Sequence, residues 1–266
     1  MKIKNKGIYI KRWFICSLFA LISLYLFSVL LNQSINSPFG TDPTADLINP
    51  NIVTTSQHPE TIVAPEPTPK PELPPELFLV NKDNPVPASY LPDGLINVYE
   101  KYKTKDVSLR DVNVLMNEEA FLACREMFIA AKADGLKGMY ILSGFRDYNA
   151  QAKLYDEYVT LGGLSDEYPQ VAQPGESEHH TGYAIDIAIL SEYTQATNLF
   201  EQTVQGKWFM ENCWDYGFIM RYPTNKKHIT GITYESWHYR YVGKQHSLNI
   251  KNSGLCLEEY LETLYN

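Results

Sequence analysis

Two short segments of the chain carry side chains suited to metal-dependent hydrolysis. The first, SEHHTGYAID, places His179 seven positions before Asp186. The second, ESWH, places Glu235 three positions before His238. Asp186 has an alanine two positions away on either side, and a carboxylate among small apolar neighbours is strongly disfavoured without a partner. A metal cation would supply that partner.

Two imidazoles and one carboxylate form the ligand set of a hydrolytic zinc site, in which the fourth position stays open to water. We therefore interpret His179, Asp186 and His238 as ligands of one zinc ion per chain. Zinc lowers the pKa of its bound water to about 7, so a nearby carboxylate can take the proton and later give it to the leaving amine. Glu235 is surplus to a three-ligand set and is predicted to be this general base. Any one of these residues alone would more often be an ordinary polar side chain.

The residues around these segments predict an α+β domain. Alternation over residues 183–190 indicates a strand with three isoleucines on one face and Ala184, Asp186 and Ala188 on the other. His180 directly follows a ligand and is predicted to point away from the metal. The other expected elements are helices over residues 117–135, 147–161 and 206–216, a closing helix from about residue 257, and strands over residues 139–142, 218–222 and 237–242.

Several motifs of this domain match the pattern of a known enzyme family. S-x-H-x-x-G-x-A-x-D at residues 177–186 is followed about fifty residues later by E-x-W-H at residues 235–238. Further matching segments are LVNK at residues 79–82, SGFR at residues 143–146 and GLCLEEYL at residues 254–261. From about Leu77 to its end, the chain resembles the zinc D-alanyl-D-alanine carboxypeptidases of the VanY type. That family is related to the VanX dipeptidases and the bacterial L,D-carboxypeptidases.

The resemblance implies a role for each matched residue. It agrees with the assignment of the three zinc ligands and of Glu235 as catalytic base. It implies that Arg146 lies near the metal, where a guanidinium binds a substrate oxygen or stabilises an oxyanion. It also implies that Ser177 and Gln151 contact the terminal residue of the peptide, as groups that hydrogen-bond a carboxylate would.

The first residues of the chain differ in charge from the remainder. Residues 1–12 hold five cations and no acid, which leaves −13 (−8 minus 5) for the rest of a chain with a formal charge of −8. This acidic balance argues against a nucleic-acid-binding protein. Residues 13–31 are nineteen uncharged and mostly apolar residues, enough for a helix across a bilayer core. By the positive-inside rule, residues 1–12 would be cytoplasmic and everything after the membrane segment would lie outside.

A cleaved signal peptide is the alternative to a membrane anchor at residues 13–31. The long apolar run ends in LLNQ without a small-x-small cleavage site, which favours the anchor. Residues 32–75 are polar and rich in proline, and they predict a disordered extracytoplasmic linker. Residues 76–266 are then a single catalytic domain with a small antiparallel sheet flanked by helices. We expect a single-pass protein of the cell membrane with an extracytoplasmic catalytic domain.

Three cysteines, Cys124, Cys213 and Cys256, lie outside the apolar run and show no CxxC spacing. The residues around them indicate small buried apolar side chains rather than a disulfide scaffold. One disulfide between two of the three remains an alternative.

The predicted function is removal of the terminal D-Ala from peptidoglycan stem pentapeptides or their precursors by a zinc D,D-carboxypeptidase. A role in glycopeptide resistance follows from the resemblance alone. An L,D-carboxypeptidase that trims tetrapeptides is an alternative, because it would use the same zinc chemistry with a different pocket. A non-catalytic zinc-binding module that recognises the cell wall is another, but such a module would not need Glu235.

Overall fold

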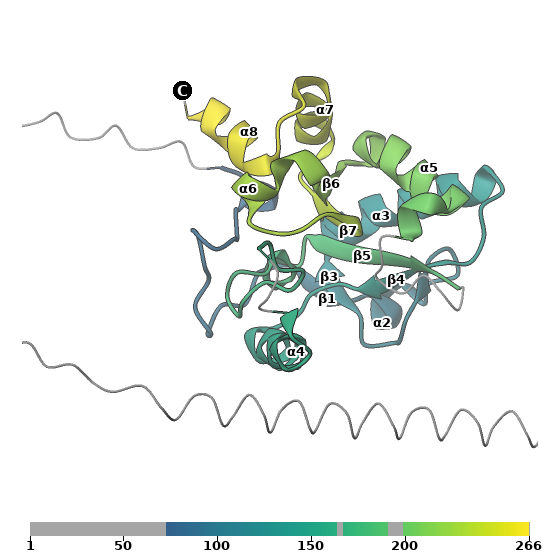
Figure 1. The fold of residues 1–266 in the computed structure, drawn as a ribbon. Coiled ribbons are helices and arrows are strands. Elements are labelled where there is room, and N and C mark those ends of the chain that lie inside the picture. Colours follow the sequence, from purple (N-terminus) through teal and green to yellow (C-terminus); the bar gives the residue numbers. More distant parts are fainter. Residues whose placement is uncertain (1–72, 164–166, 191–198, 266) are drawn as a thin grey trace, which may run out of the picture. The chain divides into compact units, whose positions relative to one another are not determined.

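The computed structural model describes residues 73–163, 167–190 and 199–265 (Figure 1). The chain divides into two units between residues 65 and 66, and all described residues belong to the second unit. The predicted membrane segment at residues 13–31, and all but the last three residues of the predicted linker at residues 32–75, lie outside the described residues. Among the residues that the structure describes, no helix is long and apolar enough to cross a bilayer.

A five-stranded sheet forms the centre of the described domain, with the strand order β2-β4-β5-β7-β6. Its strands are β2 (Ser108–Leu109), β4 (Met139–Ser143), β5 (Ala184–Ile189), β6 (Phe218–Tyr222) and β7 (Glu235–Tyr241). Neighbouring strands are antiparallel except for β2 and β4 at one edge, which are parallel. A second antiparallel pair joins β1 (Leu95–Asn97) to β3 (Leu115–Asn117). The predicted α+β domain with a small antiparallel sheet is therefore confirmed, and the parallel edge pair was not expected.

Helices cover both faces of the sheet (Figure 1). The main apolar core lies between the sheet and the helices α3 (Glu118–Ala133) and α5 (Val204–Asn212). A smaller core on the other face packs Ile219 of β6 against α7 (Lys244–Ser253) and α8 (Leu257–Leu264). The remaining helices are α2 (Val98–Tyr102), α4 (Tyr148–Thr160), α6 (Lys227–Thr230) and the 3-10 helices η1 (Pro75–Leu77), η3 (Glu178–Thr181), η4 (Phe200–Gln202), η5 (Cys213–Tyr216) and η6 (Thr224–Lys226).

The two helices next to the site begin where the sequence predicts. The side chain of Asn117 accepts hydrogen bonds from the first free backbone N–H groups of α3. The carboxylate of Asp147 accepts one from the backbone N–H of Ala150, at 2.7 Å, and so caps α4. Such caps satisfy donors that have no partner within the helix. The cap of α4 fixes the segment between β4 and that helix, which carries Arg146.

Strand β5 shows the predicted separation of faces. Its isoleucines belong to the main core, while Ala184 and Ala188 share the opposite face with Asp186 and are fully buried. The described cysteines are free and buried, which confirms their interpretation as small apolar side chains. Burial raises the pKa of the Cys124 and Cys213 thiols above the usual range, so both stay protonated.

Candidate active site

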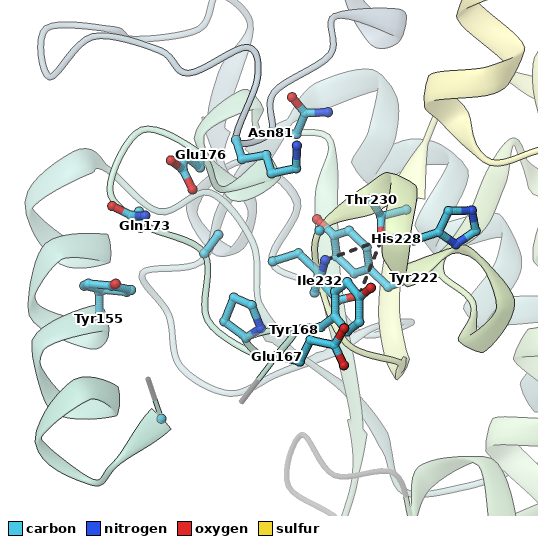
Figure 2. Close-up of a pocket in the computed structure, with 15 residues that line it drawn as sticks. Asn81, Tyr155, Glu167, Tyr168, Gln173, Glu176, Tyr222, His228, Thr230 and Ile232 are labelled. Carbon is cyan, nitrogen blue, oxygen red and sulfur yellow. Dashed lines mark hydrogen bonds between the residues drawn. The ribbon is translucent and has the colours of Figure 1, made fainter. Parts of the chain in front are cut away.

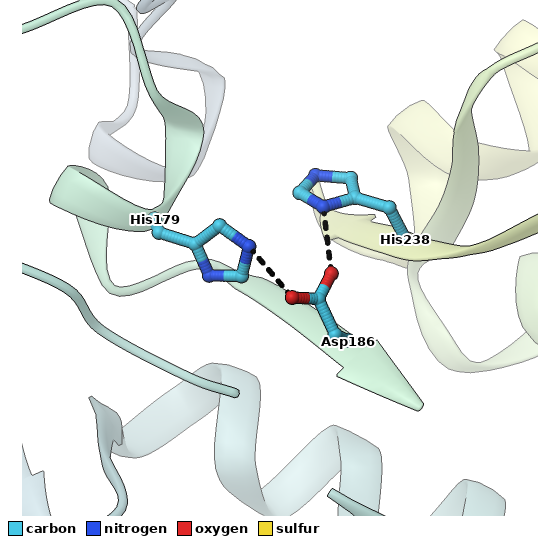
Figure 3. Close-up of side chains that lie close together, drawn as sticks. All are labelled: His179, Asp186 and His238. Carbon is cyan, nitrogen blue, oxygen red and sulfur yellow. Dashed lines mark hydrogen bonds and ion pairs between the residues drawn. The ribbon is translucent and has the colours of Figure 1, made fainter. Parts of the chain in front are cut away.

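The three residues predicted as metal ligands meet at the sheet (Figure 3). Asp186 on β5 and His238 on β7 are directly opposite in the strand register, and Nδ1 of His238 is 3.0 Å from Oδ1 of Asp186. His179 belongs to η3, just before β5, and its Nε2 is 3.2 Å from Oδ2 of Asp186. One ligand atom from each residue lies within 4.8 Å of the other two, and all three residues are buried.

This donor set fits a zinc ion. With zinc-ligand bonds of about 2.0 to 2.1 Å, ligand atoms in a tetrahedral site are about 3.3 Å apart. Here the two imidazole nitrogens lie 3.0 and 3.2 Å from different oxygens of Asp186, and one atom of each residue lies within 4.8 Å of the other two. Burial would lower the pKa of His238, but the neighbouring carboxylates of Asp186 and Glu178 outweigh this effect and raise the pKa to about 9. A histidine binds a metal as the neutral imidazole, so a bound cation would displace a proton from this side chain.

His179 is oriented by the backbone of the SGFR motif. Its Nδ1 donates to the carbonyl oxygen of Gly144 at 2.6 Å, which leaves the lone pair of Nε2 directed at Asp186 and the metal position. A side chain at residue 144 would place its Cβ 2.3 Å from the carbonyl oxygen of Leu115. Glycine therefore allows this motif to approach β3 closely enough to reach the histidine.

Glu235 is buried at the start of β7, beside the ligands. Its Oε2 lies 3.9 Å from Nδ1 of His238. Burial raises the pKa of Glu235 to about 8, with Asp186 and Glu178 adding to the shift and His238 and Arg146 opposing it. A bound cation would add positive charge nearby and lower that pKa towards neutrality. A carboxyl group in that range both accepts and returns a proton, as a general base must.

Arg146 follows β4 and reaches over the ligands. Its Nη1 donates to Oε1 of Gln151 at 2.7 Å, and its Nη2 lies 3.7 Å from Oδ2 of Asp186. Gln151 is held in turn, because its Nε2 donates to the carbonyl oxygen of Ala172 at 2.6 Å. Burial lowers the pKa of Arg146, although Asp186 and Glu235 oppose the shift. The hydrogen bond to Gln151 thus fixes one side of the guanidinium.

These side chains line one cavity of about 200 Å³, which we call the metal cavity. The sequence-predicted residues in its wall are Arg146, Gln151, Ser177, His179, Asp186, Glu235 and His238. The structure therefore brings together every residue that the sequence singled out for the site. His180 is not among them: its Nδ1 donates to the carbonyl oxygen of Arg146 at 2.7 Å, and its Nε2 accepts from the N–H of Gly175 at 3.0 Å. It points away from the metal position, as predicted.

A second cavity of about 340 Å³, which we call the adjoining cavity, shares part of this wall (Figure 2). Ala172, Tyr222 and Ile232 line both cavities. Away from the ligands, the adjoining cavity is lined by charged and aromatic side chains, among them Lys82, Tyr155, Glu167, Tyr168, Glu176 and His228. The adjoining cavity therefore lies next to the metal cavity, on the other side of these three residues.

Sequence reasoning missed four residues near the ligands. The ring of Tyr222 lies 4.9 Å from that of His238, measured between centroids. Glu178, Arg221 and Arg240 are buried behind the same histidine. Burial alone would raise the pKa of Glu178, but the two arginines and His238 hold it well below its usual value. The alternation of β6 and β7 could have predicted that Arg221 and Arg240 share a sheet face with His238. No such pattern could have predicted that Glu178 lies between the two arginines.

Known proteins resemble this chain in sequence. The family described as VanY, D-alanyl-D-alanine carboxypeptidase, matches residues 113–244. Putative carboxypeptidase YodJ of Bacillus subtilis is 40% identical over 186 residues, which cover 70% of this chain and 67% of the relative. A D-alanyl-D-alanine carboxypeptidase of Enterococcus faecium is 36% identical over 189 residues, 71% of this chain but only 58% of the relative. The bifunctional D-Ala-D-Ala dipeptidase and carboxypeptidase VanXYC of Enterococcus gallinarum is 33% identical over 191 residues, 71% of this chain and 94% of the relative.

Solved structures are similar as well. The LD-carboxypeptidase LdcB superposes with a TM-score of 0.61 at 40% identity, covering 71% of this chain and 87% of that one. A variant of the vancomycin-resistance D,D-pentapeptidase VanY in complex with Zn(II) gives a TM-score of 0.55 at 33% identity, covering 71% of this chain and 99% of that one. The similarity therefore includes both D,D- and L,D-specific enzymes.

Proposed function

This chain belongs to the VanY family of D-alanyl-D-alanine carboxypeptidases, and from that premise we propose a zinc-dependent D,D-carboxypeptidase that removes the terminal D-Ala of peptidoglycan stem pentapeptides or their precursors. One observation carries the proposal. A three-ligand metal site shares one cavity with a surplus buried carboxylate, Glu235, and a fixed guanidinium, Arg146. Metal binding alone would require neither of these groups. Because glycopeptides bind D-Ala-D-Ala termini, we include glycopeptide resistance as the proposed physiological role.

Each residue of the metal cavity has a part in the proposed reaction. When bound, zinc would act as a Lewis acid and lower the pKa of the attacking water. Glu235 takes the proton of that water and passes it to the departing amino group. Arg146, held by Gln151, stabilises the negative charge that develops on the carbonyl oxygen. Ser177, at the entrance to η3, hydrogen-bonds the carboxylate of the terminal residue.

An L,D-carboxypeptidase is the second candidate, and the similarity to LdcB favours it. Both reactions would use the same ligands and the same base. They differ in the bond that is cut, so only the products separate them.

The test is to incubate the purified protein with a synthetic pentapeptide ending in D-Ala-D-Ala and with the corresponding tetrapeptide. Mass spectrometry should show loss of one D-Ala from the pentapeptide and an intact tetrapeptide. Glu235→Gln should retain zinc and react about 10²- to 10⁴-fold more slowly, because acid–base catalysis is lost. Cleavage of the tetrapeptide alone would establish the second candidate. No cleavage of either peptide by zinc-loaded protein would identify a binding module.

We also propose that residues 13–31 anchor the protein in the cytoplasmic membrane, with the catalytic domain outside. The five cations before this uncharged run and the lack of a small-x-small site after it support the proposal. The full-length protein should fractionate with membranes, and protease added to spheroplasts should cleave the domain. A mature N-terminus near Asn32 and release into the medium would instead indicate a cleaved signal peptide.

A further inference from the structure

A cluster of four charged side chains lies behind His238, three of them fully buried and the fourth partly buried; we call it the buried ionic cluster. It consists of Glu178, Arg221, Arg240 and Glu258. Oε1 of Glu178 accepts from Nε of Arg221 at 2.8 Å and from Nη1 of Arg240 at 3.1 Å. The other two nitrogens of Arg221 donate to the two carboxylate oxygens of Glu258, at 2.9 and 2.6 Å. Glu178 and both arginines are at most 1% exposed.

Stability alone is a poor reason for such a cluster. Two arginines and two carboxylates cancel in formal charge, but the cost of removing them from water offsets much of their attraction. Apolar side chains of similar volume would often fill the same space with equal or better stability. The role of the cluster therefore has to follow from what it contacts.

The cluster contacts a metal ligand through the one Glu178 oxygen that the arginines do not use. Oε2 of Glu178 lies 3.6 Å from Nε2 of His238. Neither atom has a hydrogen-bond partner among the described residues. The separation exceeds the usual N–H···O range by about 0.4 Å, so a small approach of the two side chains completes the bond.

The geometry of His238 defines what that contact does. Its Nδ1 faces Asp186 and the metal position, so Nδ1 must offer a lone pair and Nε2 must carry the hydrogen. His179 has the opposite arrangement, because its Nδ1 donates to the backbone oxygen of Gly144 and its Nε2 faces the metal position. A backbone carbonyl thus orients one ligand, and a side chain is available to orient the other.

The cluster also connects two motifs for which the sequence gives no role. Asn81 of LVNK donates to Oε1 of Glu258 in GLCLEEYL, at 3.1 Å. Nη2 of Arg240 donates to the carbonyl oxygens of Glu76 and Phe78, at 2.9 and 2.8 Å. The beginning and the end of the described domain therefore converge on the groups that hold Glu178.

We propose that Glu178 is a positioning residue for the metal ligand His238: its carboxylate, held by Arg221 and Arg240, accepts the Nε2 hydrogen and keeps Nδ1 free to bind the metal. Glu178 itself touches neither metal nor substrate. Without it, the neutral imidazole also adopts the tautomer with hydrogen on Nδ1, which cannot bind a cation through that atom. The inference rests on the proposed zinc site and makes no use of the peptide specificity.

The test compares Glu178→Gln with the matched control Glu258→Gln. Glutamine at 178 keeps one acceptor oxygen, which cannot serve both arginines and the imidazole. Glu178→Gln should weaken zinc binding by about 10- to 100-fold, as loss of a partner to a ligating histidine typically does. It should also change the visible absorption spectrum of the cobalt(II)-substituted protein. Glu258→Gln disturbs the same cluster without touching His238, and should lower the unfolding temperature while leaving zinc affinity and cobalt spectrum at their wild-type values.

A measurement on the unaltered protein covers the case in which Glu178→Gln does not fold. Long-range ¹H–¹⁵N NMR spectra of the zinc-loaded wild type report which nitrogen of each histidine carries hydrogen. We expect hydrogen on Nε2 of His238 and on Nδ1 of His179. The inference is overturned by the opposite tautomer at His238, by unchanged zinc affinity in Glu178→Gln, or by equal losses in both variants. Zinc binding with the expected tautomers but no peptide hydrolysis would instead remove only the proposed function.

Discussion

The metal cavity and the adjoining cavity share a wall but are built differently. In the metal cavity, the three predicted ligands and Glu235 come from β5, β7 and η3 and are buried, and Arg146, on the segment between β4 and α4, is held by a hydrogen bond to Gln151. The adjoining cavity is lined mainly by connecting segments, and Lys82 in its wall is half exposed and bonded to its neighbour Asp83. Regular elements hold geometry more tightly than loops do. If the proposed function holds, we expect catalysis in the metal cavity and contacts with the rest of a long peptide in the adjoining cavity.

The largest effect is expected at Asp186, and it tests whether zinc binds in the metal cavity. Asp186→Asn keeps the size of the side chain but removes the charge that balances the cation. We expect zinc content near zero by elemental analysis, no hydrolysis, and no rise in unfolding temperature when zinc is added. Wild type should be stabilised by about 2.7 kcal/mol when free zinc is a hundred times its dissociation constant. Full zinc occupancy in the variant would show that zinc binds elsewhere in the protein.

An intermediate effect is expected at Arg146, whose guanidinium lies between Asp186 and Gln151. Arg146→Ala should keep zinc but lower turnover by about 10²-fold, as loss of one oxyanion-stabilising group does. Arg146→Lys should recover only part of this loss, because one ammonium cannot hold both Gln151 and a substrate oxygen in the planar arrangement of a guanidinium. Steady-state kcat and KM with parallel zinc analysis measure both. Full recovery by lysine would reduce the role of Arg146 to that of a simple charge.

The smallest effect is expected in the adjoining cavity. Glu176→Gln removes a charge there and should leave zinc content and kcat unchanged while raising KM for a pentapeptide by up to about tenfold, the value of one charge-assisted contact. Burial raises the pKa of Glu176, so the carboxyl group gains its proton at a higher pH than usual. The difference in KM should therefore shrink as the pH falls through that pKa. The same difference with a D-Ala-D-Ala dipeptide would mean that Glu176 acts within the metal cavity.

Sequence alone predicts those features that depend on near neighbours. The helix starts at residues 117 and 147, the alternation around Asp186 and the position of β6 are all local patterns, and the structure confirms them. The pair β1 and β3 and the parallel edge pair were not predicted, because short elements of mixed polarity carry little periodicity.

The roles of Arg221 and Arg240 illustrate a second limit. Each stands in an alternating strand, where a charged residue is ordinarily assigned to a solvated face. In the structure, that face is covered by the first residues of the described domain and by α8. Only the fold shows that these two cations are interior, and that the carboxylate of Glu178, next to His179 in the sequence, lies beside His238.

The bonds from Arg240 to the carbonyl oxygens of Glu76 and Phe78 have a mechanical consequence. Arg240 lies two residues from His238 on the same strand. A pull on the chain before Glu76 would therefore act on the strand that carries His238 as well as on the smaller core that Leu77 joins. A tethered form of this domain would place its catalytic strand under load whenever the tether is stretched.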